Sequence, residues 1–412
     1  MQLYPDKPQS KGVENALKRA RQMVELQWVP IRKIPSGYII KAPSGRVYVD
    51  AWLPAHLPQT GAIYSSVRLH SQFIGSNVSL ETYMTALANP NSVLYTRPQH
   101  GLGRSMFSYY GIVCSAFVSY VYQTPYPVAC IAWPRQEGVT PVDTTELENL
   151  QLGDLIRSLG HVAVITEILR DLNGKVHSIS VSESVAPICR CTAFTPEQFR
   201  GYWLEDGYAV YRYAGIHNVT YTPNPYVRLE DDPVAEIPPY NTAFMADYGN
   251  KANYKVGENV EFSIFEEGWE TVEITGPEGL AVSLPITDSS VIYAPPALGF
   301  YTAVCRRGDR VSQSVEFCSV EIAAQPERDT FAPGKPIEIR FQNNTPGDEV
   351  YYVQINTHDL FYIEGRNITA DEIAAGKVSI DYPLESGQYI ITLIAENKFG
   401  RYAFHGDPIT VG

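Results

Sequence analysis

The feature that most constrains this fold is a weak repeat running from about residue 247 to the C-terminal end. The stretch YKVGENVEF at residues 254–262 resembles FAPGKPIEI at 331–339, and GFYTAV at 299–304 resembles GQYIIT at 387–392. In both copies apolar and polar residues alternate over short runs separated by turn signals, which is typical of half-buried strands. The repeat therefore predicts two copies of a small all-β unit.

Small all-β repeats of this kind indicate tandem sandwiches of immunoglobulin-like type, which we place at residues 247–322 and 323–412. Neither copy has the Cys–Trp–Cys pattern of an antibody domain. Residues 217–246 are rich in Pro, Asn and Asp, so we expect a linker there, with room for one strand.

The remaining domain takes up residues 1–216, with a core at 109–213 and an N-terminal extension at 1–108. Apolar residues at helical spacing predict a helix over 12–28, and Ser79 is the expected N-cap of a second helix over 79–87. Short strands are expected at Tyr38–Ile40 and at Arg46–Val49.

Charge and composition exclude several classes of function. The net charge of -13 and the lack of a basic stripe argue against a nucleic-acid partner. No apolar run approaches the roughly 20 residues that cross a bilayer. The six cysteines show neither Cys-x-x-Cys spacing nor a Cys/His ladder, so we expect no metal and no cofactor.

Cys114 is the candidate nucleophile. Gly111 breaks the chain shortly before it, and an apolar stripe predicts a helix from Ser115 onward. A cysteine at a helix N-terminus lies beside unpaired N–H groups, which stabilise a thiolate and could bind an oxyanion. The backbone N–H groups of Cys114 and Ser115 would form that oxyanion site. A buried core cysteine is the competing interpretation.

His161 and Glu183 are the candidate base and its orienting acid. His161 opens a buried strand directly after Gly160, and the turn at residues 171–174 predicts a hairpin that brings residues 182–186 beside it. Glu183 could then accept the second N–H of the imidazole, as the third member of a catalytic triad does. A register shift of one residue would put Ser182 or Ser184 there instead.

These motifs together resemble NlpC/p60-type cell-wall peptidases. The helix-start cysteine is followed by Leu-x-x-Gly-Asp-Leu at residues 150–155 and by Gly-His-Val-Ala-Val at 160–164, while Val-Ser-Glu at 181–183 is closer to the related CHAP amidohydrolases. The resemblance covers about a hundred residues, from Tyr109 to Tyr213. It implies an α+β chain with a papain-like catalytic domain, followed by the two immunoglobulin-like sandwiches.

The resemblance also implies a bacterial enzyme that hydrolyses amide bonds in the peptide stems of peptidoglycan, as an endopeptidase of γ-D-glutamyl-diamino acid type. The sequence departs from NlpC-type members at Val113, where an acid that binds a free amine is usual, and at Ala116, where glycine is usual. A Gly-x-x-Tyr segment at 61–64 lies far upstream, which implies a long insertion over roughly 65–108. Tyr64, Tyr110 and Ser115 are the expected substrate contacts.

Several alternatives stay open. The enzyme could be an N-acetylmuramoyl-L-alanine amidase, or the chain could be an inactive module whose sandwiches bind a wall polymer or a protein. A cytoplasmic peptidase or transferase is a third class. The N-terminus lacks the apolar core of a secretory signal, so a cell-envelope or extracellular location requires that a leader has been removed.

Overall fold

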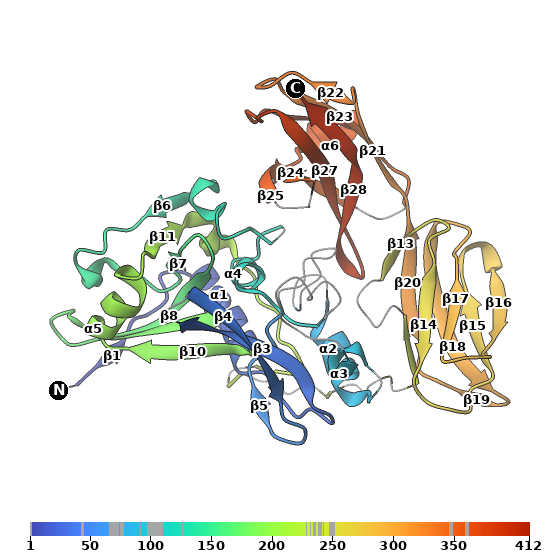
Figure 1. The fold of residues 1–412 in the computed structure, drawn as a ribbon, viewed down its shortest axis with the longest axis horizontal. Coiled ribbons are helices and arrows are strands. Elements are labelled where there is room, and N and C mark those ends of the chain that lie inside the picture. Colours follow the sequence, from blue (N-terminus) through green and yellow to red (C-terminus); the bar gives the residue numbers. More distant parts are fainter. Residues whose placement is uncertain are drawn as a thin grey trace. The chain divides into compact units, whose positions relative to one another are not determined.

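The structure is a computed structural model, and the chain separates into two compact units, shown in Figure 1. Unit 1 comprises Met1–Ser76 and Val93–Pro239, and unit 2 comprises Asn77–Ser92 and Tyr240–Gly412. The structure describes residues 2–42, 45–65, 74, 78–90, 92–96, 110–125, 127–227, 229–230, 232–233, 236–237, 241, 243–246, 252–345, 349–358 and 362–412.

Unit 1 is built on a seven-stranded sheet in which every neighbouring pair is antiparallel. The strand order is β10-β9-β8-β7-β11-β6, and β1 pairs with the far end of β8. The strands are β1 (Tyr4–Pro5), β6 (Val139–Pro141), β7 (Leu155–Arg157), β8 (Val162–Arg170), β9 (Val176–Ser184), β10 (Cys189–Phe194) and β11 (Ala209–Tyr213).

Two helices pack together against this sheet. Helix α4 (Cys114–Val121) contacts β8 and β9, and α1 (Lys11–Val24) contacts α4, β9 and β10 (Figure 1). Ser10 caps α1 by accepting a hydrogen bond from the N–H of Val13, and the apolar face of the helix is buried, as its spacing predicts. The helix ends earlier than expected, because Trp28 belongs to strand β2 instead.

The other described elements of unit 1 lie outside this sheet. The strands expected near residues 38–40 and 46–49 are confirmed as the hairpin β3–β4. The bounds are β2 (Gln27–Trp28), β3 (Ile34–Ala42), β4 (Gly45–Leu53), β5 (Gln59–Thr60), α3 (Val93–Thr96), η3 (Trp133–Arg135), η4 (Leu147–Asn149), α5 (Pro196–Phe199), η5 (Arg200–Leu204) and η6 (Ala214–Asn218).

Unit 2 holds helix α2 (Leu80–Ala88) and two β-sandwiches. The helix predicted over 79–87 is confirmed, and Ser79 caps it by accepting from the N–H of Thr82. The first sandwich consists of β12 (Phe244–Ala246), β13 (Asn253–Lys255), β14 (Val260–Ile264), β15 (Thr271–Thr275), β16 (Ala281–Pro285), β17 (Ser290–Tyr293), β18 (Gly299–Arg307), β19 (Arg310–Val311) and β20 (Val315–Val320), with the turn η8 (Pro277–Gly279).

The second sandwich follows after one residue. It consists of β21 (Ile322–Pro326), β22 (Thr330–Phe331), β23 (Ile337–Asn343), β24 (Glu349–Thr357), β25 (Tyr362–Asn367), β26 (Lys377–Ile380), β27 (Gly387–Asn397) and β28 (Gly400–Val411), together with helix α6 (Ala370–Ala375). Strand β12 falls inside the stretch expected to be a linker with room for one strand, and it pairs with β14.

The two sandwiches have the same strand order. Sheets β12-β14-β17 and β13-β20-β18-β15-β16 of the first correspond to β21-β23-β26 and β22-β28-β27-β24-β25 of the second. In both, the early strand beside the last one is parallel to it, β13 with β20 and β22 with β28. The repeated sequence stretches occupy matching strands, and both domains are immunoglobulin-like sandwiches.

The two cores differ in chemistry. Aromatic rings fill the first, where Tyr301 and Phe317 stack with their centroids 5.1 Å apart. Aliphatic side chains dominate the second, where Val353, Ile355 and Leu393 pack together. One strand order is therefore stabilised by two kinds of packing.

The α+β, papain-like class expected for the chain is wrong. Strand accounts for 43% of the chain and helix for only 18%, so the protein is mostly β. The expectation extended a resemblance over about a hundred residues to the whole chain, whereas both sandwiches and the large sheet of unit 1 are made of strands. In unit 1 two helices, α1 of 14 residues and α4 of 8, pack on a sheet of seven strands.

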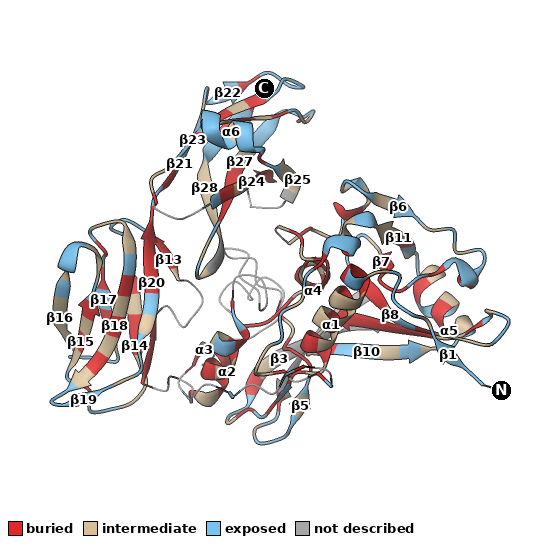
Figure 2. Cartoon of the chain, turned by 180° about the vertical axis from the view of Figure 1, so that it is seen from behind, coloured by how far each residue is buried: buried red, intermediate tan, exposed pale blue. Residues whose placement is uncertain are grey.

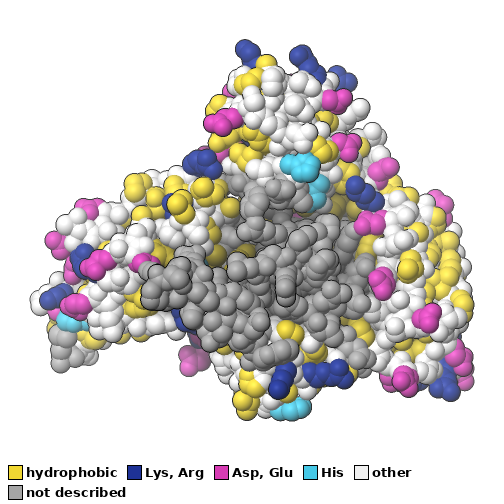
Figure 3. Space-filling view, in the orientation of Figure 1, with side chains coloured by type: hydrophobic (Ala, Val, Ile, Leu, Met, Phe, Trp, Pro, Cys, Tyr) yellow, Lys and Arg dark blue, Asp and Glu magenta, His cyan; other side chains and the backbone are white. Residues whose placement is uncertain are grey.

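Among the described residues, no helix is both long and apolar enough to cross a membrane. Among the described residues on the face drawn in Figure 3, Lys and Arg side chains are spread over the surface together with Asp and Glu.

Candidate functional site

The segment before α4 is fixed by backbone contacts that leave no room for a side chain at Gly111. Gly111 has φ +153°, and a Cβ there would lie 2.3 Å from the Cβ of Ser65. The N–H of Ile112 donates to the carbonyl of Ile63 at 3.0 Å, and the Ser184 hydroxyl donates to the carbonyl of Ile112 at 2.5 Å. These contacts set the position at which the next residues, Val113 and Cys114, begin the helix.

Cys114 is the first residue of α4, one position earlier than the sequence suggests. Val113 is the N-cap residue and makes no side-chain capping bond, so the first-turn N–H groups of Cys114 and Ser115 have no acceptor within the helix or from a cap. The Cys114 side chain is buried, with 5% of the residue exposed. The site thus combines a helix-terminal sulfur with free N–H groups beside it.

His161 and Glu183 lie together as the hairpin predicts. The Nε2 atom of His161 is 2.7 Å from Oε2 of Glu183, and both side chains are largely shielded from solvent. Cys114 interacts with the same imidazole and is one of the groups that raise its pKa.

The register settles which residue orients the imidazole. Strand β8 pairs with β9 so that Val164 lies opposite Ser182. Ser182 instead contacts the hydroxyl of Thr166 at 2.9 Å, and Ser184 binds the segment before α4. Glu183 is therefore the neighbour of His161, and neither serine replaces it.

Arg190 is the second partner of the Glu183 carboxylate, and the sequence analysis did not identify it. It lies opposite Glu183 on β10, and its Nε donates to Oε1 of Glu183 at 2.9 Å. Strand β10 is the edge strand next to β9 and has exposed residues, as Figure 2 shows, and the Arg190 side chain is half exposed. The two oxygens of Glu183 are thus shared between a buried imidazole and a guanidinium at the edge of the sheet.

Cys130 is a second sulfur at the site, and the sequence analysis assigned it no role. Its Sγ lies 3.7 Å from Sγ of Cys114, and both cysteines are free. Arg157 of β7 holds this loop by donating from Nε to the Cys130 carbonyl at 2.8 Å. Cys130 follows Cys114 by 16 residues, and no spacing motif marks the pair.

Cys114, Cys130, His161 and Glu183 form a cluster, the Cys114 cluster, in which the charge of each group affects the pKa of its neighbours. Cys130 as a hydrogen-bond partner and burial raise the pKa of Cys114 well above its ordinary value, against the opposing effect of His161. The same contact lowers the pKa of Cys130. Burial alone would lower the pKa of His161, but Cys114 and Glu183 raise it to about 10. Burial would raise the pKa of Glu183, yet His161 and Arg190 hold it below its usual value.

Aromatic rings form a wall beside the imidazole. The rings of His161 and Trp203 are parallel within 8° with centroids 6.2 Å apart, and Tyr208 meets His161 edge-on. Tyr202 packs edge-on against Trp203 and is half exposed. No sequence pattern predicted this wall, apart from the general surplus of aromatic residues.

The three residues expected to contact substrate differ in their exposure to solvent. Tyr110 is fully buried, so its side chain belongs to the core rather than to an open surface. Tyr64 is partly exposed and its backbone bridges to Ile112, while Ser115 is half-buried in the first turn of α4. The expected insertion over residues 65–108 lies largely outside the described residues.

The Gly-Asp pair of the strand motif is structural. Gly153 has φ +84°, and a Cβ there would meet Ile216 at 2.3 Å. Asp154 is buried and accepts from Nε of Arg212 at 2.8 Å and from the N–H of Gln151 at 2.8 Å. Burial raises the pKa of Asp154 in spite of these partners.

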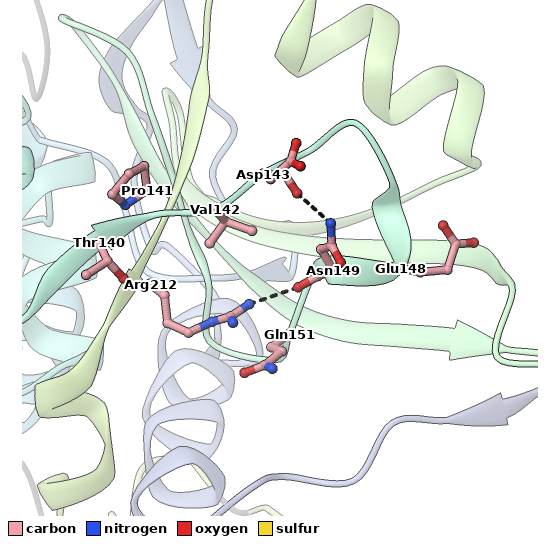
Figure 4. Close-up of a pocket in the computed structure, with 8 residues that line it drawn as sticks. All are labelled: Thr140, Pro141, Val142, Asp143, Glu148, Asn149, Gln151 and Arg212. Atoms are coloured by element: carbon pink, nitrogen blue, oxygen red, sulfur yellow. Dashed lines mark hydrogen bonds between the residues drawn. The ribbon is translucent and has the colours of Figure 1, made fainter.

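A polar hollow of about 500 Å³ lies at the β6–β11 edge of the same sheet, shown in Figure 4. Asn149 bridges it by donating to the carbonyl of Asp143 and accepting from Arg212. None of its lining residues belongs to the Cys114 cluster. The described residues contain no group of three or more His, Cys, Asp or Glu side chains arranged to hold a metal ion.

Comparison with known proteins adds little to this geometry. No family model matches the chain, and no curated protein matches it. Among solved structures, fibronectin(III)-like modules of Clostridium thermocellum CbhA align at 14% identity over 39% of this chain and 87% of theirs, with a TM-score of 0.21. A two-domain fibronectin type-III segment from chicken tenascin aligns at 10% identity over 40% of this chain and 97% of its own, also with a TM-score of 0.21. Scores this low carry no argument about function.

Proposed function

We propose that unit 1 is a cysteine-dependent amide hydrolase in which Cys114 is the nucleophile, His161 the general acid and base, and Glu183 the orienting acid. The observation that carries the proposal is the 2.7 Å contact between His161 and Glu183, with the imidazole also interacting with Cys114 at the start of α4. A nucleophile, a base and an orienting group in contact are the signature of covalent catalysis.

In the proposed reaction, the Cys114 thiol passes its proton to His161 as the sulfur attacks the amide carbonyl, and the oxyanion accepts hydrogen bonds from the first N–H groups of α4. Beside the charged Cys114 sulfur and Glu183 the pKa of His161 is raised to about 10, so the imidazole holds this proton and can then give it to the leaving amine. Thioester formation removes the charge of Cys114, which is one cause of that high pKa. The neutral imidazole can then accept a proton from the water that hydrolyses the thioester.

Peptidoglycan stem peptides are the substrate we propose, with an N-acetylmuramoyl-L-alanine linkage as the alternative. The support is the resemblance of residues 150–155 and 160–164 to NlpC/p60-type peptidases, with Val113 standing where those enzymes usually place an amine-binding acid. In this proposal the protein acts at the cell envelope, and the sandwiches bind a wall polymer or a protein.

Digestion of purified muropeptides, followed by mass analysis of the products, tests the proposal. Wild type should cleave an amide bond, and Cys114→Ala should leave the muropeptides intact. Cys191→Ser, which changes an exposed thiol on β10, is the matched control and should cleave as wild type does. Cleavage by Cys114→Ala, or failure of the folded wild type to cleave any muropeptide, would refute the proposal.

The burial of Cys114 favours one alternative, an inactive module that only binds. Iodoacetamide labelling separates the two, because a catalytic Cys114 must react faster near neutral pH than the buried Cys189, Cys305 and Cys318. If Cys114 is as inert as these three, the binding module is the better description.

A further inference from the structure

We propose that Cys114 and Cys130 form a reversible disulfide when the chain meets a hydroperoxide, so that the proposed nucleophile is also a site of oxidative modification. The disulfide itself does not depend on the proposed function. The loss of hydrolysis that would accompany it does rest on that function.

The geometry brings the two sulfurs together without a bond. They are 3.7 Å apart, and a disulfide requires about 2.05 Å. Cys114 is fixed at the start of α4, whereas Cys130 lies in a turn outside regular secondary structure. The approach therefore needs only a local movement of the Cys130 loop, with the helix left in place.

Exposure indicates which sulfur reacts first. Cys130 is half-buried and Cys114 is almost fully buried, so a small oxidant reaches Cys130 more easily. The contact with Cys114 and the nearby Arg157 cation favour the thiolate form of Cys130, which is the form that attacks peroxides.

The chemistry balances with hydrogen peroxide as the oxidant. The Cys130 thiolate attacks one peroxide oxygen, the O–O bond breaks, and the departing hydroxide is protonated to water, leaving a sulfenic acid. The Cys114 thiol then attacks the sulfenic sulfur. The S–S bond forms as the S–O bond breaks, and the departing hydroxide takes up the Cys114 proton and leaves as a second water.

The disulfide would block the nucleophilic sulfur of Cys114 and would also protect it from irreversible oxidation. Sulfur in a disulfide cannot attack an amide. Other thiols can reduce the disulfide and restore both cysteines, whereas a sulfenic acid that forms no disulfide can be oxidised further and irreversibly. Without Cys130, an oxidised Cys114 would have no neighbouring sulfur at this site to resolve it.

Peptide mass mapping of the full chain tests the proposal without any activity assay. Trypsin leaves Cys114 and Cys130 on one peptide, residues 105–135, separate from the other four cysteines. After treatment with hydrogen peroxide and alkylation under denaturing conditions, this peptide should be two hydrogen atoms lighter and unalkylated. Dithiothreitol should restore both alkylation sites.

Two variants make the outcome decisive. Cys130→Ser should leave a single thiol that goes on to sulfinic acid and is not recovered by dithiothreitol, while Cys191→Ser should still form the link. If the wild-type peptide keeps both alkylatable thiols, or gains oxygen without losing hydrogen, the proposal is wrong. A link that forms in a chain that cleaves no muropeptide would refute the proposed function and leave this modification standing.

Discussion

Two buried carboxylates of the same sheet, Asp154 and Glu183, are each paired with an arginine but have different surroundings. Arg212 engages both oxygens of Asp154, and a backbone N–H supplies a further donor. Glu183 divides its oxygens between Arg190 and His161. The pKa is raised for Asp154 and lowered for Glu183. A carboxylate whose partners are all structural anchors the fold, whereas one that binds an imidazole can take part in chemistry.

The largest expected effect follows from Glu183→Gln. The amide can still accept a hydrogen bond, but it removes the charge that stabilises the imidazolium and opposes Arg190. By analogy with loss of a triad carboxylate, we expect kcat to fall on the order of 10³–10⁴-fold. Steady-state kinetics on muropeptides checks this. A loss confined to KM would show that Glu183 does not act through His161.

The matching change at the anchor is Asp154→Asn. It leaves Arg212 with a weakened partner at a buried site, so we expect the free energy of unfolding to fall by about 1–3 kcal/mol. Activity per folded molecule should stay near that of wild type. Urea unfolding and an assay normalised to folded protein measure the two effects. A loss of kcat with unchanged stability would reverse the roles assigned to the two acids.

The pH dependence of stability sharpens the comparison further. His161 has a pKa of about 10 in the folded chain, above its ordinary value of 6.5. Between these values the folded chain holds a proton that the unfolded chain releases, so this contribution is complete below pH 6.5 and is lost as pH rises toward 10. Urea unfolding across this range should show the loss in wild type and Asp154→Asn, and a smaller loss in His161→Gln. An equal loss in all three would contradict the assignment.

The smallest effect is expected from Arg190→Met. This guanidinium is half exposed, so we expect a loss of activity of about two- to fivefold. Since Arg190 lowers the pKa of Glu183, its removal should move the acidic limb of the pH–rate profile to higher pH. Arg190→Lys should restore the limb in part. A purely structural arginine would lower stability and leave the profile unmoved.

The sequence predicts those parts of the site that depend on local pattern. The turn at residues 171–174 predicted a hairpin that brings residues 182–186 beside His161, but the choice of Glu183 over Ser182 and Ser184 required the register of β8 and β9, which contains two irregularities. Cys130 and Arg190 were missed for different reasons. Cys130 reaches the site through a loop without a repeating pattern, and Arg190 depends on a second hairpin, β9–β10, whose register was not followed.

At the level of the fold, the repeated sequence stretches predicted where both sandwiches lie. The alternation of apolar and polar residues and the turn signals are present in both copies, although the copies are only weakly similar in sequence. The class of the whole chain could not be obtained in this way. It depends on how much of the chain is strand, and the motifs that suggested α+β are confined to about a hundred residues.

The different cores of the two sandwiches bear on how the chain avoids misfolding. Neighbouring domains with one strand order are prone to exchange strands while both are incompletely folded. A strand of the second sandwich placed in the first would set aliphatic side chains where stacked rings such as Tyr301 and Phe317 belong, and it would leave cavities. In the reverse exchange, a strand of the first sandwich would bring aromatic rings into the mainly aliphatic second core and overpack it. The mismatch between the cores thus penalises each exchanged pairing and favours two independently folded domains.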